Sequence, residues 1–254
     1  MDNFNFIKKF QLYDQSATLI HLPYGDIVYN KKLDTRFENY LLIKTLLKKE
    51  DFVLVEEEFK KLERIPTIYF EDKDELLPNT ELLRENGYKN SWKDSWMFYK
   101  ELISFQNEFT KVKEVKSEKE LQLFVETFDN SYQKNDPQNP YGDVKEYLGG
   151  IKEKWEEYGQ TEYIKYFIDY ADDAPVGVAA LTSTDGLGYI SAVGTLQNVR
   201  GKGYGKLITQ YAVYISQQIG NTSHFLLTEE GTYPYEFYQR IGFVHQFSTL
   251  GYFK

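Results

Sequence analysis

The sequence predicts an α/β protein built around a mixed β-sheet, and the order of elements in its second half supports this prediction. Three strand-like segments, at residues 161–170, 176–183 and 189–196, follow one another with short polar turns. A glycine-rich loop and a helical pattern then precede another strand-like segment at residues 224–229. An antiparallel meander followed by a strand–helix–strand unit gives a mixed sheet with helices on both faces.

The helices of the second half follow from amphipathic spacing and from signals at their ends. A capping-box pattern begins at Ser117, and Leu121 and Phe124 then lie on one helical face. Gly220 and Gly242 stand where helices are expected to end. By the same criteria we expect further helices at residues 147–155, 208–219 and 235–241, and a closing strand at residues 243–253.

The first half predicts a smaller α/β domain, which we place at residues 1–111, before a second domain at residues 112–254. Residues 110–117 are interpreted as a linker or an exposed strand. A weak internal repeat relates residues 82–99 to residues 237–253, and the first half is then a divergent copy of the second. The other interpretation is that any short helix followed by glycine and a strand has this pattern. The elements expected in the first half are helices at residues 37–47, 56–64 and 78–86 and strands at residues 65–72 and 95–102.

The composition argues against several classes of site and partner. The 254 residues include 39 acidic and 30 basic side chains, a net charge of −9, so we expect no nucleic-acid partner. The absence of cysteine excludes disulfides, cysteine-ligated zinc and a cysteine nucleophile, and with three scattered histidines we expect no metal site. We find neither a secretory signal pattern nor an apolar run near the ~18 residues of a membrane span. We therefore expect a cytoplasmic monomer or homodimer without membrane contact.

The most informative segment is RGKGYGK, which follows a predicted strand and opens a predicted helix. Its glycines remove Cβ atoms where a ligand could approach the backbone, and N–H groups in a first helical turn favour an anion. The segment matches neither the Walker A pattern nor the dinucleotide fingerprint. It therefore predicts a phosphate or diphosphate site of another kind, or else a surface turn rich in glycine and lysine. The residues expected to contribute are Arg200, Gly201, Lys202, Gly203, Tyr204, Gly205 and Lys206.

This loop resembles motif A of the GNAT superfamily of N-acyltransferases, [RQ]-x-x-G-x-[GA], which Arg200, Gly203 and Gly205 match. Residues 175–181 resemble part of that family's strand meander, and residues 238–243, YQRIGF, resemble its motif B. The resemblance covers residues 112–254. It implies a GNAT-like fold, in which an antiparallel meander is followed by a βαβ unit.

The resemblance implies acetyl-CoA, or another acyl-CoA, as the acyl donor. Its diphosphate would lie on the N–H groups of the glycine loop, and its pantetheine arm would run beside the strand from Val193 to Thr195. A backbone N–H of that strand could stabilise the oxyanion of a tetrahedral intermediate. Tyr238 matches the family's general acid, although a core aromatic is the other interpretation in a chain with 22 tyrosines.

The general base is less well defined by the sequence. Glu229 and Glu230 follow the predicted strand at residues 224–229, and either could accept a proton from an amine, directly or through water. A solvated acidic pair is the other interpretation. His224 and His245 are weaker candidates, for which we favour structural roles.

The expected function is transfer of an acetyl group from acetyl-CoA to a primary amine, carried by a small molecule or a peptide. Gly231 stands where the family often has Asn, and Pro234 where a small helical residue is usual. These departures and the uncertain base leave a second possibility, a non-catalytic acyl-CoA-binding or sensor module. The first half has no glycine loop, and Leu83 stands where the repeat would place the catalytic Tyr, so it is expected to have lost the chemistry.

Overall fold

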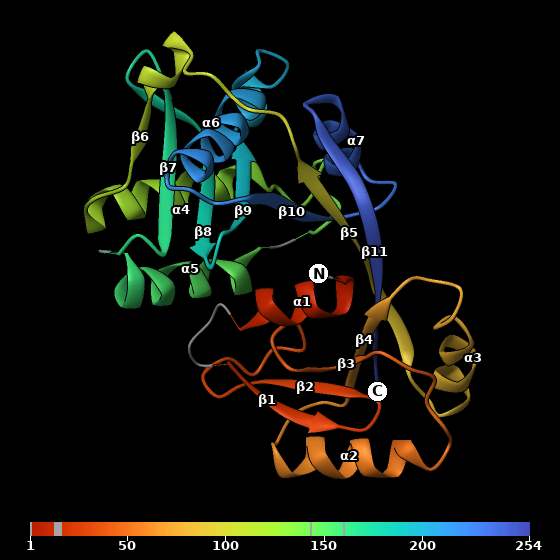
Figure 1. Cartoon of the computed structure of the whole chain (residues 1–254). Helices are drawn as coiled ribbons and strands as arrows, with labels where there is room; N and C mark the ends of the chain where they lie inside the picture. The colour runs from red at the N-terminus through yellow and green to blue at the C-terminus, as the bar shows by residue number, and fades with distance from the viewer. Residues whose placement is uncertain (1, 13–16, 143, 160) are drawn as a thin grey trace. The chain divides into compact units, whose positions relative to one another are not determined.

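The computed structural model describes residues 2–12, 17–142, 144–159 and 161–254, which form two compact units. Unit 1 contains the chain up to Trp96 together with Gln246–Lys254, and unit 2 contains Met97–His245. Two strands, β5 (Lys89–Tyr99) and β11 (Phe243–Phe253), pass from one unit into the other (Figure 1). The expected boundary between residues 111 and 112 lies inside unit 2, and as a limit between independently folding domains it stays a prediction.

Unit 2 contains the predicted mixed sheet. Its strands neighbour one another in the order β10-β9-β8-β7-β6, and every pair is antiparallel except β9 with β10. The strands are β6 (Val112–Glu114), β7 (Ile164–Ala171), β8 (Ala174–Thr184), β9 (Leu187–Thr195) and β10 (Ser223–Glu229). The predicted meander and the parallel pair after it are therefore confirmed, and the segment at residues 110–117 contains an edge strand.

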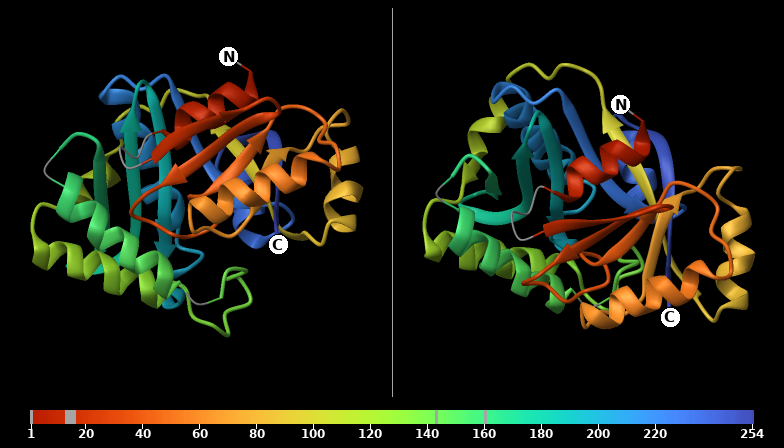
Figure 2. Two further views of the ribbon diagram at one scale, coloured as in Figure 1. Left: turned by 90° about the horizontal axis from the view of Figure 1, so that it is seen from below. Right: turned by 60° about the horizontal axis from the view of Figure 1, so that its bottom comes forward.

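Helices cover both faces of this sheet, as predicted (Figure 2). On β7, Tyr166 and Ile168 pack in the core beneath α4 (Glu118–Ser131) and α5 (Lys145–Tyr158). Phe167 between them points to the opposite core, beneath α6 (Tyr204–Gln218). This alternation follows from the two-residue period of a strand. The last helix of the unit, α7, covers Tyr233–Arg240.

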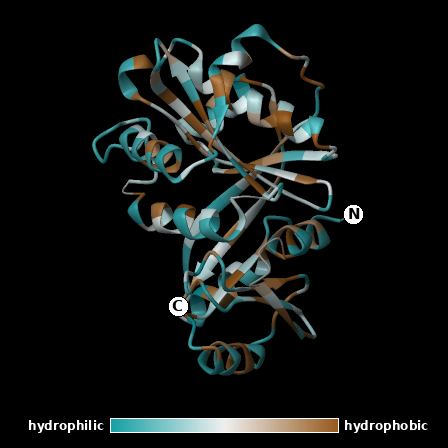
Figure 3. Ribbon diagram, turned by 90° about the vertical axis from the view of Figure 1, so that its left-hand side faces the viewer, coloured by the Kyte–Doolittle hydropathy of each residue, from teal (hydrophilic) through white to brown (hydrophobic). Residues whose placement is uncertain are grey.

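The helix ends agree with their sequence signals. The Oγ of Ser117 accepts a hydrogen bond from the N–H of Glu120 at 3.3 Å, and the Glu120 carboxylate accepts one from the N–H of Lys116, next to the cap residue. Gly220 and Gly242 adopt positive φ angles of 88° and 108° just beyond the ends of α6 and α7. Along the helices, hydrophobic and hydrophilic residues are interspersed, as Figure 3 shows by colour.

Unit 1 contains the strand order β1-β2-β3-β4-β11-β5, in which β3 and β4 are parallel. The expected helix at residues 37–47 is wrong, because Tyr40–Ile43 forms β3, with all four side chains buried. A short unbroken apolar run covered on both faces cannot be told from a helical segment by periodicity. The elements are α1 (Asn3–Gln11), β1 (Ala17–Leu22), β2 (Gly25–Asn30), β3, α2 (Asp51–Lys61), β4 (Thr67–Glu71) and α3 (Pro78–Glu85), with parts of β5 and β11.

The two units repeat one order of elements. In each, an antiparallel three-stranded meander leads through a helix into a strand parallel to the meander's last strand, and then into a short helix and a long strand. The short helices α3 and α7 end alike, with Gly87 at φ 83° and Gly242 at φ 108°. The interpretation of the first half as a divergent copy is therefore supported by the fold. Each short helix carries one large buried residue at the same place, Leu83 in unit 1 and Tyr238 in unit 2.

Candidate functional site

The site predicted from the sequence lies where β9 and β10 of unit 2 separate. The two strands pair only through Leu187–Tyr189 and Ser223–Phe225, near their beginnings, as far as the described residues show (Figure 1). Further along β9, its register with β8 shifts between Val178 and Ala180, and Ala192 adopts a positive φ of 47°. This β-bulge accompanies an open edge of β9, residues 190–195, whose backbone is not paired with β10.

The glycine loop follows β9 directly and begins α6. Gly201 and Gly203 adopt φ angles of 77° and 92°, a conformation that side chains with a Cβ rarely adopt. A Cβ built on either residue would have no heavy atom within 4 Å, so the space above both is open. Among the described residues, no carbonyl or side chain accepts a hydrogen bond from the N–H groups of residues 201–206. The loop therefore presents free N–H groups to open space at the positive end of a helix dipole.

Gly205 has a different role from the other two glycines. A Cβ at this position would lie 3.1 Å from the Thr195 Oγ1 and 3.2 Å from the ring of Phe237. The missing side chain thus lets the first turn of α6 pack against the end of β9 and against α7. The sequence predicted all three glycines as places where a ligand approaches, and the structure gives that possibility to Gly201 and Gly203.

The cationic side chains of the loop also differ in whether they are free to contact a ligand. Lys202 and Lys206 are exposed and make no ion pair with a described residue. The Arg200 side chain is only 23% exposed, and its guanidinium contacts partners within unit 2. Its Nη1 forms an ion pair with the Asp136 Oδ2 at 2.5 Å. The predicted positive charge of the loop is therefore available at the two lysines, whereas the charge of Arg200 is already neutralised.

The carboxyl group of Asp136 is ionised in this ion pair. Burial by itself would raise the pKa of its carboxyl. Hydrogen bonds from the Gln138 N–H, from Gln197 and from Arg200, together with the Arg200 charge, outweigh burial and lower that pKa below its ordinary value. The pair is therefore charged at neutral pH.

The segment between α4 and α5 contributes two phenols to the open edge. The Tyr132 hydroxyl donates to the Val193 carbonyl oxygen at 2.5 Å, and the Tyr141 hydroxyl lies 3.0 Å from the Thr228 Oγ1 on β10. Residues 132–142 therefore contact both separating strands. The Val193 carbonyl, one of the backbone groups expected to face a ligand, is occupied by Tyr132.

Tyr238 lies on α7 in the core beneath α6, with 9% of its surface exposed. Its ring packs on Phe243 with centroids 5.7 Å apart. Burial raises the pKa of its phenol well above 10, and nearby tyrosines, Tyr132 and Tyr141 among them, act in the same direction. The phenol is therefore protonated at neutral pH, as a proton donor must be.

The two carboxylates proposed as a base stand at the end of β10, and both are exposed. The turn there is closed by Thr232, whose Oγ1 donates to the Glu229 carbonyl oxygen at 2.6 Å. Neither the role of Glu229 nor that of Glu230 is tested by this placement. His224 is buried at the start of β10, where its Nδ1 lies 2.8 Å from the Ser216 Oγ, and burial lowers its pKa, which fits the structural role expected for it.

Unit 1 has no counterpart of the glycine loop. The corresponding helix, α2, follows β3 and begins after Glu50 with Asp51, so acidic side chains stand where a phosphate would need positive charge. The segment before α2 is also bound to α3, because the Asn79 Oδ1 accepts a hydrogen bond from the N–H of Leu47 at 2.8 Å. The first unit therefore lacks the features of the glycine loop at this point.

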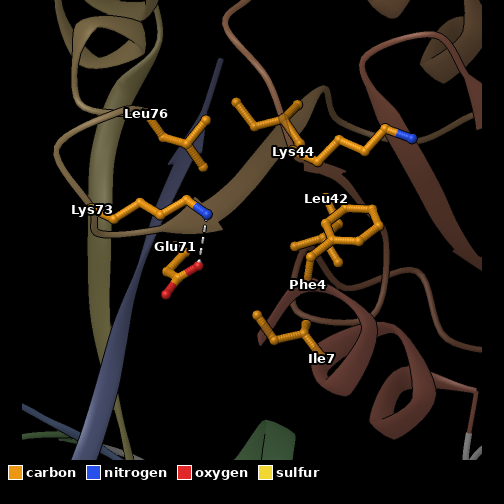
Figure 4. Close-up of a pocket in the computed structure, with 8 residues that line it drawn as sticks. Phe4, Ile7, Leu42, Lys44, Glu71, Lys73 and Leu76 are labelled. Atoms are coloured by element: carbon orange, nitrogen blue, oxygen red, sulfur yellow. Dashed lines mark ion pairs between the residues drawn. The ribbon is translucent and has the colours of Figure 1, made fainter. Parts of the chain in front are cut away.

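A small cavity of about 20 Å³, room for about one water molecule, lies near the carboxyl ends of β3 and β4 (Figure 4). Phe4 and Leu42 form part of its apolar wall, and Lys73 beside it is paired with Glu71 at 3.2 Å.

In the described part of the chain, no group of three or more His, Cys, Asp or Glu side chains could hold a metal ion. No described helix is both long and apolar enough to cross a bilayer.

Sequence reasoning missed the residues of the segment that follows α4. It assigned no role to Tyr132, Asp136 or Tyr141, all of which contact the predicted site. Asp136 and Arg200 are far apart in the sequence, and no local pattern relates them. The bulge at Ala192 also has no local signal, since alanine does not favour a positive φ.

Comparison with known proteins gives one family and a common fold. Residues 122–243 match the model of the acetyltransferase (GNAT) family. A functionally unknown conserved protein from Staphylococcus epidermidis has 17% identity and a TM-score of 0.68, with 94% of each chain covered. A GCN5-related N-acetyltransferase from Kribbella flavida has 16% identity and a TM-score of 0.66, with 100% of this chain and 96% of that chain covered.

The repeat has a parallel among solved structures as well. A tandem GNAT protein from the clavulanic acid biosynthesis pathway has 9% identity and a TM-score of 0.55, with 100% of this chain and 88% of that chain covered. At these identities the likeness shows the fold, and it extends over both units. No curated protein matches the sequence.

Proposed function

We propose that the chain is an acyl-CoA-dependent N-acyltransferase, on the premise that its residues 122–243 form a domain of the GNAT acetyltransferase family. The observation that carries the proposal is the glycine loop. Its N–H groups at residues 201–206 have no partner among the described residues, and no atom lies within 4 Å of a Cβ built on Gly201 or Gly203. Free N–H groups at a helix N-terminus are suited to a diphosphate.

The residues present fit the acyl carrier. The loop N–H groups, with Lys202 and Lys206, would bind the diphosphate of acetyl-CoA or another acyl-CoA. The pantetheine arm would follow the open edge of β9 between Val193 and Thr195. Because the Tyr132 hydroxyl occupies the Val193 carbonyl, that phenol would move or share the carbonyl when the arm binds.

The chemistry requires two proton movements, and this chain offers residues for both. The amine nitrogen forms a bond to the thioester carbonyl carbon, and a backbone N–H of Val193–Thr195 would stabilise the resulting oxyanion. As the carbon–sulfur bond breaks, Tyr238 would give its proton to the departing thiolate. Glu229 or Glu230 would accept a proton from the attacking amine, directly or through water.

The acceptor class remains a primary amine of a small molecule or a peptide, and an acetyl group is the acyl group we expect. We also keep the expectation of a cytoplasmic monomer or homodimer. A non-catalytic acyl-CoA-binding or sensor module is the second candidate. Gly231 and Pro234 favour it, because they change the segment next to both proposed carboxylates.

Calorimetric titration with acetyl-CoA and release of free thiol across a panel of amines test the proposal together. We expect saturable binding at one site and thiol release with at least one amine, with the acetylated product identified by its mass. Tight binding without turnover of any amine would favour the binding module. Absence of binding by a folded protein would contradict both.

A further inference from the structure

We propose that Arg200 is a positioning residue: its guanidinium holds residues 131–138, here called the anchored segment, against the glycine loop and so sets the acceptor side of the site. This inference rests on the proposed function. It differs from the prediction made from the sequence, in which Arg200 adds positive charge for the diphosphate.

The geometry of the guanidinium shows what it binds. Besides the ion pair with Asp136, Nη1 donates to the Gln138 Oε1 at 3.1 Å. Nη2 donates to the Ser131 carbonyl oxygen at 2.9 Å, and Nε donates to the Thr195 carbonyl oxygen at 3.3 Å. The planar fork thus joins the end of α4, the following turn and the end of β9. Lysine, a point charge on a flexible stem, cannot make this set of bonds.

The electrostatics of the pair argue against a second role in binding phosphate. The Asp136 side chain is only 3% exposed, and separating a largely buried ion pair leaves an uncompensated charge. An incoming diphosphate would therefore have to compete with a carboxylate already in place. The exposed side chains of Lys202 and Lys206 carry no such cost.

The anchored segment also determines where two phenols lie. Tyr132 stands between two residues that Arg200 binds, Ser131 and Asp136, and Tyr141 follows shortly after the segment. Their hydroxyls contact the Val193 carbonyl on β9 and the Thr228 hydroxyl on β10. These two contacts place the phenols beside the open edge of β9, where the thioester would lie. Arg200 therefore acts on the acceptor through the segment and does not itself touch it.

Arg200→Gln and Asp136→Asn remove the anchor from its two sides, and Lys202→Gln is the matched control in the same loop. The first readout is independent of activity: trypsin cleavage after Lys134, which is exposed within the anchored segment, followed by mass spectrometry. We expect Arg200→Gln and Asp136→Asn to speed this cleavage at least about tenfold, because proteolysis follows the population of the opened segment. Lys202→Gln should cleave after Lys134 at the wild-type rate.

The second readout separates the two sides of the site. Arg200→Gln and Asp136→Asn should raise the KM for whichever amine the wild type acetylates by about tenfold, about 1.4 kcal/mol, and should not weaken coenzyme A binding, because the Tyr132 hydroxyl that they free occupies the Val193 carbonyl beside the pantetheine arm. Lys202→Gln should show the reverse, a weaker coenzyme A affinity with little change in the amine KM. Arg200→Lys should behave like Arg200→Gln, because charge alone does not restore the fork.

Two results would overturn the inference. One is unchanged cleavage after Lys134 in folded Arg200→Gln and Asp136→Asn proteins. The other is a loss of coenzyme A affinity in Arg200→Gln that equals the loss in Lys202→Gln. If no amine is acetylated, the proposed enzyme activity fails by itself, while the cleavage and the coenzyme A titration still decide the role of Arg200.

Discussion

Replacing Gly203 by Glu tests the glycine loop, and α6 itself supplies the control. Gly203 and Gly220 stand at opposite ends of the helix with φ angles of 92° and 88°, and neither would have a heavy atom within 4 Å of an added Cβ. Any side chain at such a φ costs about 1–2 kcal/mol of stability. The two Glu variants therefore share their backbone strain and differ in where the carboxylate lies.

The expected effects on stability and on binding differ in size. Both variants should lose about 1–2 kcal/mol of unfolding free energy, with Gly220→Glu losing slightly more because its carboxylate faces the negative end of the helix dipole. A carboxylate about 4 Å from a diphosphate charge near a protein surface repels it by up to about 4 kcal/mol. With allowance for screening, Gly203→Glu should weaken coenzyme A binding at least about 30-fold, while Gly220→Glu should bind like the wild type.

Urea unfolding and calorimetric titration with coenzyme A measure these two quantities on the same samples. A third variant, Gly203→Gln, has nearly the same size without the charge and should fall between the other two in affinity. Equal coenzyme A affinities for Gly203→Glu and Gly220→Glu would refute the assignment of the diphosphate to this loop.

The remaining predictions concern one proton donor and one buried acid. Tyr238→Phe should lower kcat about 100-fold with little change in coenzyme A affinity, measured by thiol release and calorimetry, and an unchanged kcat would remove Tyr238 from the mechanism. Burial raises the pKa of Asp169 from 3.8 to about 6. The folded chain therefore holds a proton that the unfolded chain has lost between these values, and stability falls as the pH rises through this window. Asp169→Asn should match the wild type near pH 4 and exceed it by about 3 kcal/mol at pH 8 in urea unfolding; equal stabilities at both pH values would contradict this.

Local signals predicted the second half of the chain well. Ser117 and Gly220 mark real helix ends. Successive side chains along the strands point alternately into the two cores. The same reasoning failed at residues 40–43, because a short apolar strand covered on both faces carries no period. It also gave no sign that β5 and β11 are divided between the two units, with one part of each strand in unit 1 and the other part in unit 2.

The candidate site was predictable where neighbouring residues define it. The glycine loop is a continuous motif, and its positive φ angles at Gly201 and Gly203 are what glycine is needed for. The partner of Arg200 was not predictable, because the ion pair with Asp136 depends on how α4 packs on the sheet. A motif residue that local reasoning assigns to a ligand can therefore be occupied by the fold itself.

The central claim is that free backbone N–H groups of the glycine loop bind the diphosphate of the acyl carrier. Titration of ¹⁵N-glycine-labelled protein with coenzyme A observes these groups directly. We expect the amide resonances of Gly201, Gly203 and Gly205 to shift together and saturate at one equivalent, and the resonance of Gly220 to stay in place. Saturable binding that leaves the three loop resonances unmoved would contradict the claim.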